Sequence, residues 1–412
     1  MAKLALLGGK PVTTQKIGPM PWPPRSESTA EALKQVYLSG QWSFNSVEEQ
    51  AFEKEFAAYT GAKHAIFMVN GTVTLEAALA ALNVGPGDEV IVPALTWMAT
   101  AMAVHYVGAK PVFVDIEPTT LCLDPEKFKQ AITPRTKAVI PVHLLGSMAH
   151  LDKIIATAKA HKIAVVEDCA HMQGGFWKGK GVGAIGDIGS FSFQQSKTLS
   201  SGEGGICLTN DDELADRLYR FKHIGYGRGA EQGGAKAGPP EGLRCHNYRC
   251  TAFQAVILRH QLKALPKLMK TYASNVATIK KILTGVKGVR IQEPGAKATQ
   301  QGYYNLAFIF DSAPMKDIPQ DTIIAALNAE GMACGGTYGP VYKHTLYNAL
   351  PSEYRIAGGS CPVAEITGTT RTVTVSHYTL SNSKSNIRKI GEIIKKVVTN
   401  AAELKDYVPA TK

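Results

Sequence analysis

The chain has 412 residues, and 45 lysines and arginines against 34 aspartates and glutamates give it a formal net charge of +11. Its 45% hydrophobic and 19% charged residues suit a folded protein with a large core and exclude disordered and collagen-like chains. At about 150 residues per domain, this length predicts two or three domains.

Residues 25–60 have the spacing of amphipathic helices, and after them short apolar runs alternate with helical segments. Continuous apolar runs are typical of strands buried on both faces, and their alternation with helices indicates βαβ units. The sequence therefore predicts a large α/β domain over residues 25–265, built on a mostly parallel sheet. Its expected strands include residues 64–69, 88–94, 111–116, 138–143 and 164–168.

The second part of the chain has a different layout. Residues 228–243 are rich in glycine, proline and alanine, which predicts a long surface loop. Beyond a helical stretch at 252–284, expected strands and helices alternate less regularly and end in a helix near residues 386–400. We therefore expect a smaller α+β domain over residues 266–412, with residues 1–24 packed against it.

Composition also bears on the compartment and the partners. The seven cysteines are odd in number and scattered, which favours a reducing compartment over a disulfide framework. The apolar stretch Leu4–Leu7 is too short for a signal peptide, and no apolar run approaches the ~18 residues of a transmembrane helix. Basic residues form pairs such as Lys280-Lys281 but no longer clusters. We expect a cytoplasmic protein without nucleic-acid or membrane partners.

One motif suggests a nucleotide but does not fit its expected surroundings. Gly181-Val-Gly183-Ala-Ile-Gly186 matches the G-x-G-x-x-G pattern of dinucleotide sites, which needs a strand before it and a helix after it. Here polar, flexible residues precede the pattern and the strand-like SFSF follows. We interpret the motif as a turn that leads into a strand.

Two segments carry side chains suited to catalysis. The expected strand at 164–168 ends in Asp168, and an acid at the carboxyl end of a strand needs a cationic partner, although it could equally cap the next helix. Lys197 lies between a strand and a Gly-rich turn. A buried lysine can lose its proton and become a nucleophile, whereas a lone lysine in a turn is more often a solvated charge.

A third segment, NGT at 70–72, joins a strand to a helix and offers either an anion site or a simple helix cap. An anion cradle, an acid at a strand end, a nucleophilic lysine and the aromatic Trp97 together describe a pocket for pyridoxal 5'-phosphate (PLP). Cys245 and Cys250 are too isolated for a zinc knuckle, and no metal site is expected.

The ordered motifs resemble those of the DegT/DnrJ/StrS family of sugar aminotransferases, which are PLP enzymes of fold type I. The matching stretches cover most of residues 60–260 and include NGT, PALTW, VEDCAH, SFSFQQSKTLSSGEGG and HNYRCTAFQAV. The resemblance implies transfer of an amino group from glutamate or glutamine to a keto-sugar, possibly nucleotide-linked, or to a keto-cyclitol. QQSK and PVHLLGSMAH favour a cyclitol of the scyllo-inosose type.

The resemblance also implies roles for single residues. Lys197 matches the Schiff-base lysine, and Asp168 matches the partner of the pyridine nitrogen. Trp97 takes the ring-stacking position, and His171 lies by the phenolic oxygen of the ring. The remaining cofactor contacts are expected at the phosphate group, from Gly71, Thr72, Val73 and Ser192.

Three further roles concern the partner subunit and the substrate. Asn247, in HNYR, matches an asparagine that crosses to the phosphate of the partner subunit, so the resemblance implies a homodimer with shared active sites. Tyr342 and His377 fall near positions that line the substrate pocket in relatives, although this part of the chain matches less well.

Two other functions use the same fold. A dehydratase or aromatising relative could employ the same lysine for elimination of water. A non-catalytic regulatory homologue could retain the fold alone, but the intact pair of Asp168 and Lys197 argues against it. We therefore expect a PLP-dependent aminotransferase.

Overall fold

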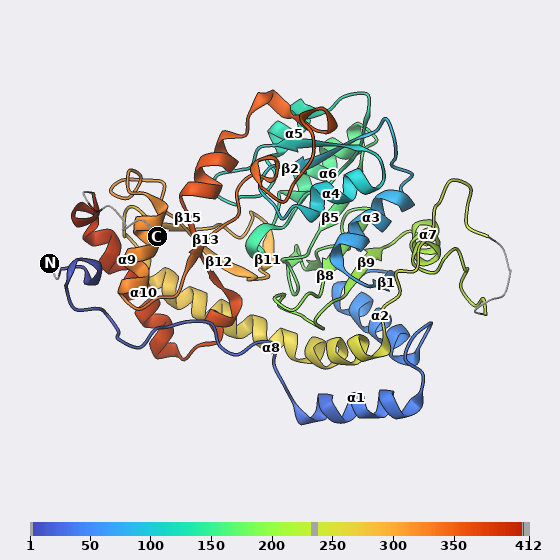
Figure 1. Ribbon diagram of the computed structural model, residues 1–412, viewed down its shortest axis with the longest axis horizontal. Helices are drawn as coiled ribbons and strands as arrows, with labels where there is room; N and C mark the ends of the chain where they lie inside the picture. The colour runs from blue at the N-terminus through green and yellow to red at the C-terminus, as the bar shows by residue number, and fades with distance from the viewer. Residues whose placement is uncertain (1–2, 232–237, 406, 408–412) are drawn as a thin grey trace.

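The computed structural model describes residues 3–231, 238–405 and 407, so residues 232–237 of the predicted loop lie outside the described part. An eight-stranded sheet forms its centre, in the order β1-β9-β8-β5-β4-β2-β3-β14 (Figure 1). Neighbouring strands from β8 to β14 are parallel, whereas β9 runs antiparallel to both of its neighbours. The strands are β1 His64–Met68, β2 Glu89–Pro93, β3 Lys110–Val114, β4 Thr136–Val139, β5 Ala164–Asp168, β8 Ile188–Ser192, β9 Gly205–Thr209 and β14 Arg355–Ile356.

The large sheet confirms the predicted α/β architecture. The expected strands correspond to β1 through β5, and every residue of β2, β8 and β9 is buried. Strands covered on both faces need apolar or small residues at each position, and this produces the continuous runs in the sequence. The turn around Gly183 leads directly into β8, as predicted, and no helix follows it.

Ten α-helices surround the sheets within the described residues. Several begin at side-chain caps: Ser26, Ser46, Asn70 and Asp211 each accept a hydrogen bond from an amide in the first turn that follows. No helix in the described part of the chain is long and apolar enough to cross a membrane. The helices are α1 Glu27–Ser39, α2 Val47–Thr60, α3 Gly71–Ala81, α4 Ala99–Tyr106, α5 Pro125–Ala131, α6 Leu151–Ala160, α7 Asp212–Lys222, α8 Ala252–Leu283, α9 Gln320–Ala329 and α10 Lys384–Thr399.

The second region, residues 284–405 and 407, forms a four-stranded antiparallel sheet and contributes one strand to a three-stranded antiparallel sheet with residues 176–181. The four-stranded sheet has the order β10-β12-β15-β13, and its strands lie beside α9 and α10 at the end of the molecule where both termini are found (Figure 1). The three-stranded sheet has the order β11-β6-β7. These strands are β6 Phe176–Trp177, β7 Lys180–Gly181, β10 Arg290–Ile291, β11 Ala298–Gln300, β12 Asn305–Ile309, β13 Gly335–Gly336 and β15 Thr372–Ser376.

Two features cross the predicted boundary near residue 265. Helix α8 runs without a break through that position and packs against α10. Strand β14 returns to the large sheet, where Arg355 pairs with Val112 of β3. The division into residues 25–265 and 266–412 stays a prediction.

The N-terminal segment contacts the second region. Ile17 forms a parallel bridge with Met332, just beyond α9, and the amide of Leu4 donates to the Glu403 carboxylate at 3.1 Å. Residues near both ends of the chain therefore pack together.

Candidate active site

A cavity of about 580 Å³ lies at the carboxyl edge of the large sheet, where β5 ends and α3 begins. Ligands of open α/β sheets bind at this edge. The segment between β8 and β9 and two segments of the second region complete the wall. Most of the residues predicted to contact the cofactor line this cavity, namely Gly71, Thr72, Trp97, Asp168, His171, Ser192 and Lys197.

Asp168, the last residue of β5, accepts two hydrogen bonds from the described residues. The Thr100 hydroxyl donates to Oδ2 at 2.9 Å, and the Ala170 amide donates to Oδ1 at 3.1 Å. Burial raises the pKa of Asp168, and these donors and the charge of Lys197 oppose the rise only in part. Because a carboxylate has about four acceptor positions, Asp168 retains capacity for another donor, such as a protonated ring nitrogen.

Lys197 lies in the turn between β8 and β9, where its amide donates to the Gln194 carbonyl at 2.8 Å. Its side-chain nitrogen lies 4.5 Å from the centre of the Tyr304 ring. Burial lowers the pKa of Lys197 to about 8, against the opposing charge of Asp168. Such a lysine is partly neutral near neutral pH, and its neutral amine can attack a carbonyl carbon.

The start of α3 forms an anion site. Asn70 accepts the Val73 amide at 2.9 Å, while Gly71 and Thr72, whose amides precede the helical hydrogen-bond ladder, line the cavity. A Cβ atom on Gly71 would lie 2.6 Å from the Cβ of Ser192, so glycine permits the close approach of these segments. The resulting cradle of amides and a hydroxyl fits the phosphate of PLP.

His171 presents a neutral ring to the cavity. Its Nδ1 accepts the Leu145 amide at 3.3 Å, which places the ring proton on Nε2. Burial, with the charge of Lys197, holds the pKa of His171 well below its ordinary range. The ring stacks on Tyr304, with 4.0 Å between centroids and 17° between planes. His171 can therefore donate Nε2–H to an oxygen atom in the cavity.

Three residues that sequence reasoning did not single out also line the cavity: Thr100, Tyr304 and Tyr338. Thr100 lies in α4, three residues or about one helical turn after Trp97. A search for polar residues one turn after Trp97 would have found it. The Tyr338 ring meets Trp97 edge-on at 5.9 Å, and its buried hydroxyl has no hydrogen-bond partner among the described residues. Both tyrosines come from beyond α8, where the sequence matches the family motifs less well.

Two residues predicted to contact the phosphate, Val73 and Asn247, do not line the cavity. Val73 is buried within α3, and its amide is occupied by Asn70. Asn247 forms an antiparallel bridge with His223, beyond α7, and does not line the cavity of its own chain. The roles of Val73 and Asn247 stay predictions, and the role of Asn247 concerns a partner subunit.

The residues predicted to contact substrate are also set apart from the cavity lining. The Tyr342 hydroxyl donates to Glu365 at 2.6 Å. His377 is buried, and its Nε2 donates to the carbonyl of Ser196 at 2.9 Å. Ser196 is the residue directly before Lys197 in the chain. Burial lowers the pKa of His377 to about 4, so the ring is neutral. His377 supports the lysine turn in this structure, and substrate contacts by Tyr342 and His377 stay predictions.

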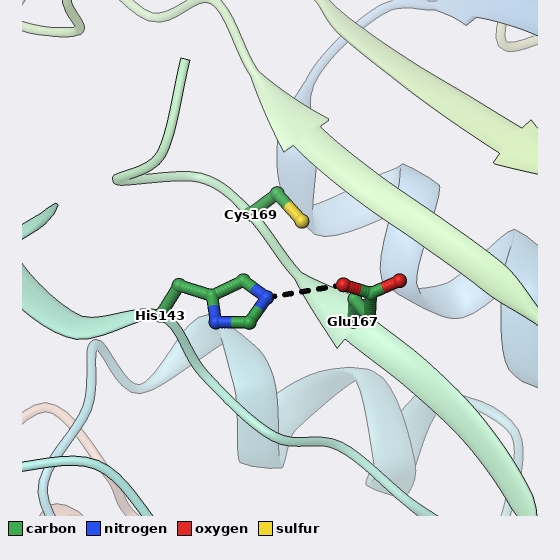
Figure 2. A group of neighbouring side chains, drawn as sticks. All are labelled: His143, Glu167 and Cys169. Carbon is green, nitrogen blue, oxygen red and sulfur yellow. Dashed lines mark hydrogen bonds and ion pairs between the residues drawn. The ribbon is translucent and has the colours of Figure 1, made fainter. Parts of the chain in front are cut away.

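On the other face of β5, His143, Glu167 and Cys169 each offer an atom that could bind a metal, and these atoms lie within 4.8 Å of one another (Figure 2). Glu167 accepts the amides of Gly183, Ile185 and Gly186 at 2.7 to 2.9 Å and the Nε2–H of His143 at 3.2 Å.

The chemistry of this cluster differs from that of a metal site. The Ala149 amide donates to His143 Nδ1, so both ring nitrogens of His143 are engaged. Burial and the neighbouring carboxylates raise the pKa of Cys169 well above its ordinary range, whereas metals bind the thiolate. We interpret the cluster as structural, and the glycine motif as the source of the amides that hold Glu167.

Comparisons with known proteins agree with this geometry. The profile of the DegT/DnrJ/EryC1/StrS aminotransferase family matches residues 24–394. An L-glutamine:2-deoxy-scyllo-inosose aminotransferase of Streptoalloteichus tenebrarius is 36% identical over 98% of this chain and 99% of its own length. A protein of the same name from Micromonospora echinospora is 35% identical over 98% of this chain and all of its own length.

Solved structures give the same result. An aminotransferase from Psychrobacter cryohalolentis is 33% identical, covers 93% of this chain and 99% of its own, and superposes with a TM-score of 0.83. The 3-amino-5-hydroxybenzoic acid synthase is 28% identical over 94% of this chain and all of its own, also with a TM-score of 0.83. The chain therefore belongs to the DegT/DnrJ/EryC1/StrS aminotransferase family and is a PLP-dependent aminotransferase of fold type I.

Proposed function

We propose that the enzyme transfers the amino group of L-glutamine to a keto-cyclitol of the scyllo-inosose type. The observation that carries the reaction class is the pairing of half-buried Lys197 with buried Asp168 in one cavity at the carboxyl edge of the sheet. The substrates are supported by relatives of 34 to 36% identity over nearly the full chain, whose names specify L-glutamine and a scyllo-inosose derivative.

The cavity residues would hold PLP along its length. Gly71, Thr72 and Ser192 would bind the phosphate, and Asp168 would bind the ring nitrogen. His171 would donate to the phenolic oxygen through Nε2–H. When bound, PLP supplies a carbonyl carbon for the incoming amine and a ring that withdraws electrons from the adjacent carbon.

The side chains supply the proton chemistry. The neutral amine of Lys197 would take the proton from the α-carbon of glutamine. It would then return a proton to the cofactor carbon that carries the amino group. Thr100 orients the Asp168 carboxylate and favours its ionised form, in which it keeps a bound ring nitrogen protonated. In the second half-reaction, the same groups would act in reverse on the keto-cyclitol, and ping-pong kinetics would result.

We also propose that the protein acts as a homodimer in the cytoplasm. Asn247 lies away from the cavity of its own chain, as expected if it reaches the phosphate site of a partner. Mixing Asn247→Asp with Lys197→Ala tests this arrangement, because a mixed dimer has one cavity free of both lesions. Activity should partly return after subunit exchange, and no recovery would contradict a shared site. All seven cysteines are free, which suits a reducing compartment.

An isotope experiment tests the proposed reaction. The holoenzyme is incubated with glutamine carrying nitrogen-15 at its α-amino group and with 2-deoxy-scyllo-inosose, other keto-cyclitols or nucleotide-linked keto-sugars. We expect labelled amine on the cyclitol, parallel lines in double-reciprocal plots, and no product with Lys197→Ala. Labelled product from the nucleotide-linked sugars alone would overturn the substrate, and a dehydrated or aromatised product without label would overturn the reaction.

A further inference from the structure

Tyr304 joins the second region to the reactive lysine. It directly precedes β12, far along the chain from the motifs of the large sheet, yet its ring lines the cavity. The ring centre lies 4.5 Å from Lys197 Nζ on one side, and the ring stacks on His171 at 4.0 Å. Its hydroxyl lies 3.0 Å from the Ser196 hydroxyl. Tyr304 is thus fixed at three points around Lys197.

The face of an aromatic ring attracts a cation, because the π-electrons give it a negative potential. This attraction favours the ammonium form of Lys197 and so acts against burial, which favours the neutral amine. Several other titratable groups lie around Lys197. The charge of Asp168 favours the ammonium form of Lys197, while His171 and His377 are neutral. Tyr338 and Glu203 also line the cavity, and burial raises the pKa of Tyr338 well above its ordinary range, so its hydroxyl is uncharged.

We propose that Tyr304 is a positioning residue whose ring face holds the Lys197 amine whenever that amine is free, and that it favours the protonated form there. The proposal rests on the proposed function, because it takes Lys197 to be the lysine that binds PLP. Lys197 would be free before the cofactor is attached and again whenever another amine takes its place on the cofactor.

The contact geometry separates the ring from the hydroxyl. Tyr304→Phe keeps the ring face and loses only the contact with Ser196. Tyr304→Leu removes the ring, and Tyr304→Met does so while filling more of its volume. Tyr338→Leu is the matched control, because it removes a ring of the same size from the same cavity, and no cation–π contact joins Tyr338 to Lys197 among the described residues.

The experiment measures the capture of PLP by the apoenzyme and needs no turnover. Capture is followed by absorbance from about pH 6 to about pH 9.5, and each variant is normalised to its own plateau at high pH. Borohydride reduction and peptide mapping then locate the modified lysine. Only the neutral amine attacks the aldehyde, so the midpoint of the profile reports the balance between ammonium and amine.

We expect wild type, Tyr304→Phe and Tyr338→Leu to share one midpoint. Tyr304→Leu and Tyr304→Met should shift it to lower pH, and their normalised capture near pH 7 should rise about three-fold, the size expected for loss of a partly buried cation–π contact. Equal midpoints for wild type and the two aliphatic variants would overturn the proposal, as would a Tyr304→Phe variant that behaves like Tyr304→Leu. Modification of a lysine other than Lys197 in wild type would instead overturn the proposed function.

Discussion

Two neighbouring acids on opposite faces of β5 differ in the number of hydrogen bonds that they accept. Glu167 and Asp168 are both buried, and successive residues of a strand point to opposite faces. Behind the strand, Glu167 accepts four N–H donors from the turn at 183–186 and from His143. At the cavity, Asp168 accepts two donors from the described residues, from Thr100 and Ala170.

The pKa shifts of the two carboxyl groups follow this difference. Burial alone would raise the pKa of Glu167, but the His143 hydrogen bond and the amides of Gly186 and Gly183 outweigh it and lower the pKa. At Asp168, burial outweighs the weaker set of donors and raises the pKa. Unused hydrogen-bonding capacity, rather than burial or charge, therefore distinguishes Asp168, the acid that we propose acts on the cofactor, from Glu167, which we interpret as structural.

The largest effect is expected at the cavity face, from Lys197→Ala. If Lys197 is the nucleophile and proton carrier, as proposed, loss of its amine should lower turnover at least about 1000-fold while folding is retained. Steady-state assays, together with borohydride reduction and peptide mapping, measure this. Normal attachment of PLP to the Lys197→Ala variant would show that another lysine carries the cofactor.

On the other face, Gly183→Ala should act on stability. Gly183 has φ +82°, and a Cβ atom there would lie 2.5 Å from the Phe191 ring and 3.3 Å from the sulfur of Cys169. The left-handed backbone and the overlap together should lower the free energy of unfolding by about 2–5 kcal/mol. Urea denaturation measures the loss. Gly179→Ala is the matched control, because that glycine also has positive φ but an open Cβ position.

A smaller effect is expected from Thr100→Val, which removes a donor to Asp168 without changing the side-chain shape. The Thr100 hydrogen bond lowers the pKa of Asp168, so its loss should raise that pKa further. If Asp168 acts as the ionised carboxylate, as proposed, the acidic limb of the kcat profile should move to higher pH. Near neutral pH, kcat should fall about 10-fold, as for a hydrogen bond to a charged group. An unchanged acidic limb would contradict this role.

The smallest effect is expected from removing the hydroxyl group of Tyr338, and Tyr342 serves as the comparison. The Tyr338 hydroxyl in the cavity has no partner among the described residues, whereas the Tyr342 hydroxyl donates to Glu365. If free capacity indicates a ligand contact, Tyr338→Phe should raise KM for the keto-cyclitol by about 3- to 10-fold, and Tyr342→Phe should leave it unchanged. Initial-rate kinetics decide between them, and the reverse result would favour the substrate role expected for Tyr342.

The sequence predicted the large sheet well because its buried parallel strands leave continuous apolar runs. It also identified Asp168 and Lys197 as candidates, since Asp168 ends one strand and Lys197 follows another at the edge where ligands bind. The glycine pattern at 181–186 leads into a strand, as predicted, but the sequence did not indicate what its backbone amides bind. Only the folded structure brings those amides to Glu167.

The missed residues depend on contacts between distant segments. Tyr304 and Tyr338 reach the cavity from the second region, at more than 100 residues from Lys197, and neither lies in a recognisable motif. The helical stretch predicted at 252–284 corresponds to α8, but helical periodicity carries no information on which sheet each half of the helix contacts. The roles of such residues depend on which side chains they contact, and these contacts can be known only from the folded structure.

A paired comparison of Asp168→Asn with Glu167→Gln tests most directly whether the two acids have separate roles in catalysis and stability. Both kcat and the free energy of unfolding are measured on the same preparations. If the cavity carboxylate acts on the reaction, as proposed, Asp168→Asn should lose at least about 100-fold in kcat with stability within about 1 kcal/mol of wild type. Glu167→Gln should lose about 3 kcal/mol of stability with kcat per folded molecule within about threefold, because an amide cannot accept all four N–H donors. Loss of kcat in Glu167→Gln with stability retained, or wild-type kcat in Asp168→Asn, would contradict the division of the two acids.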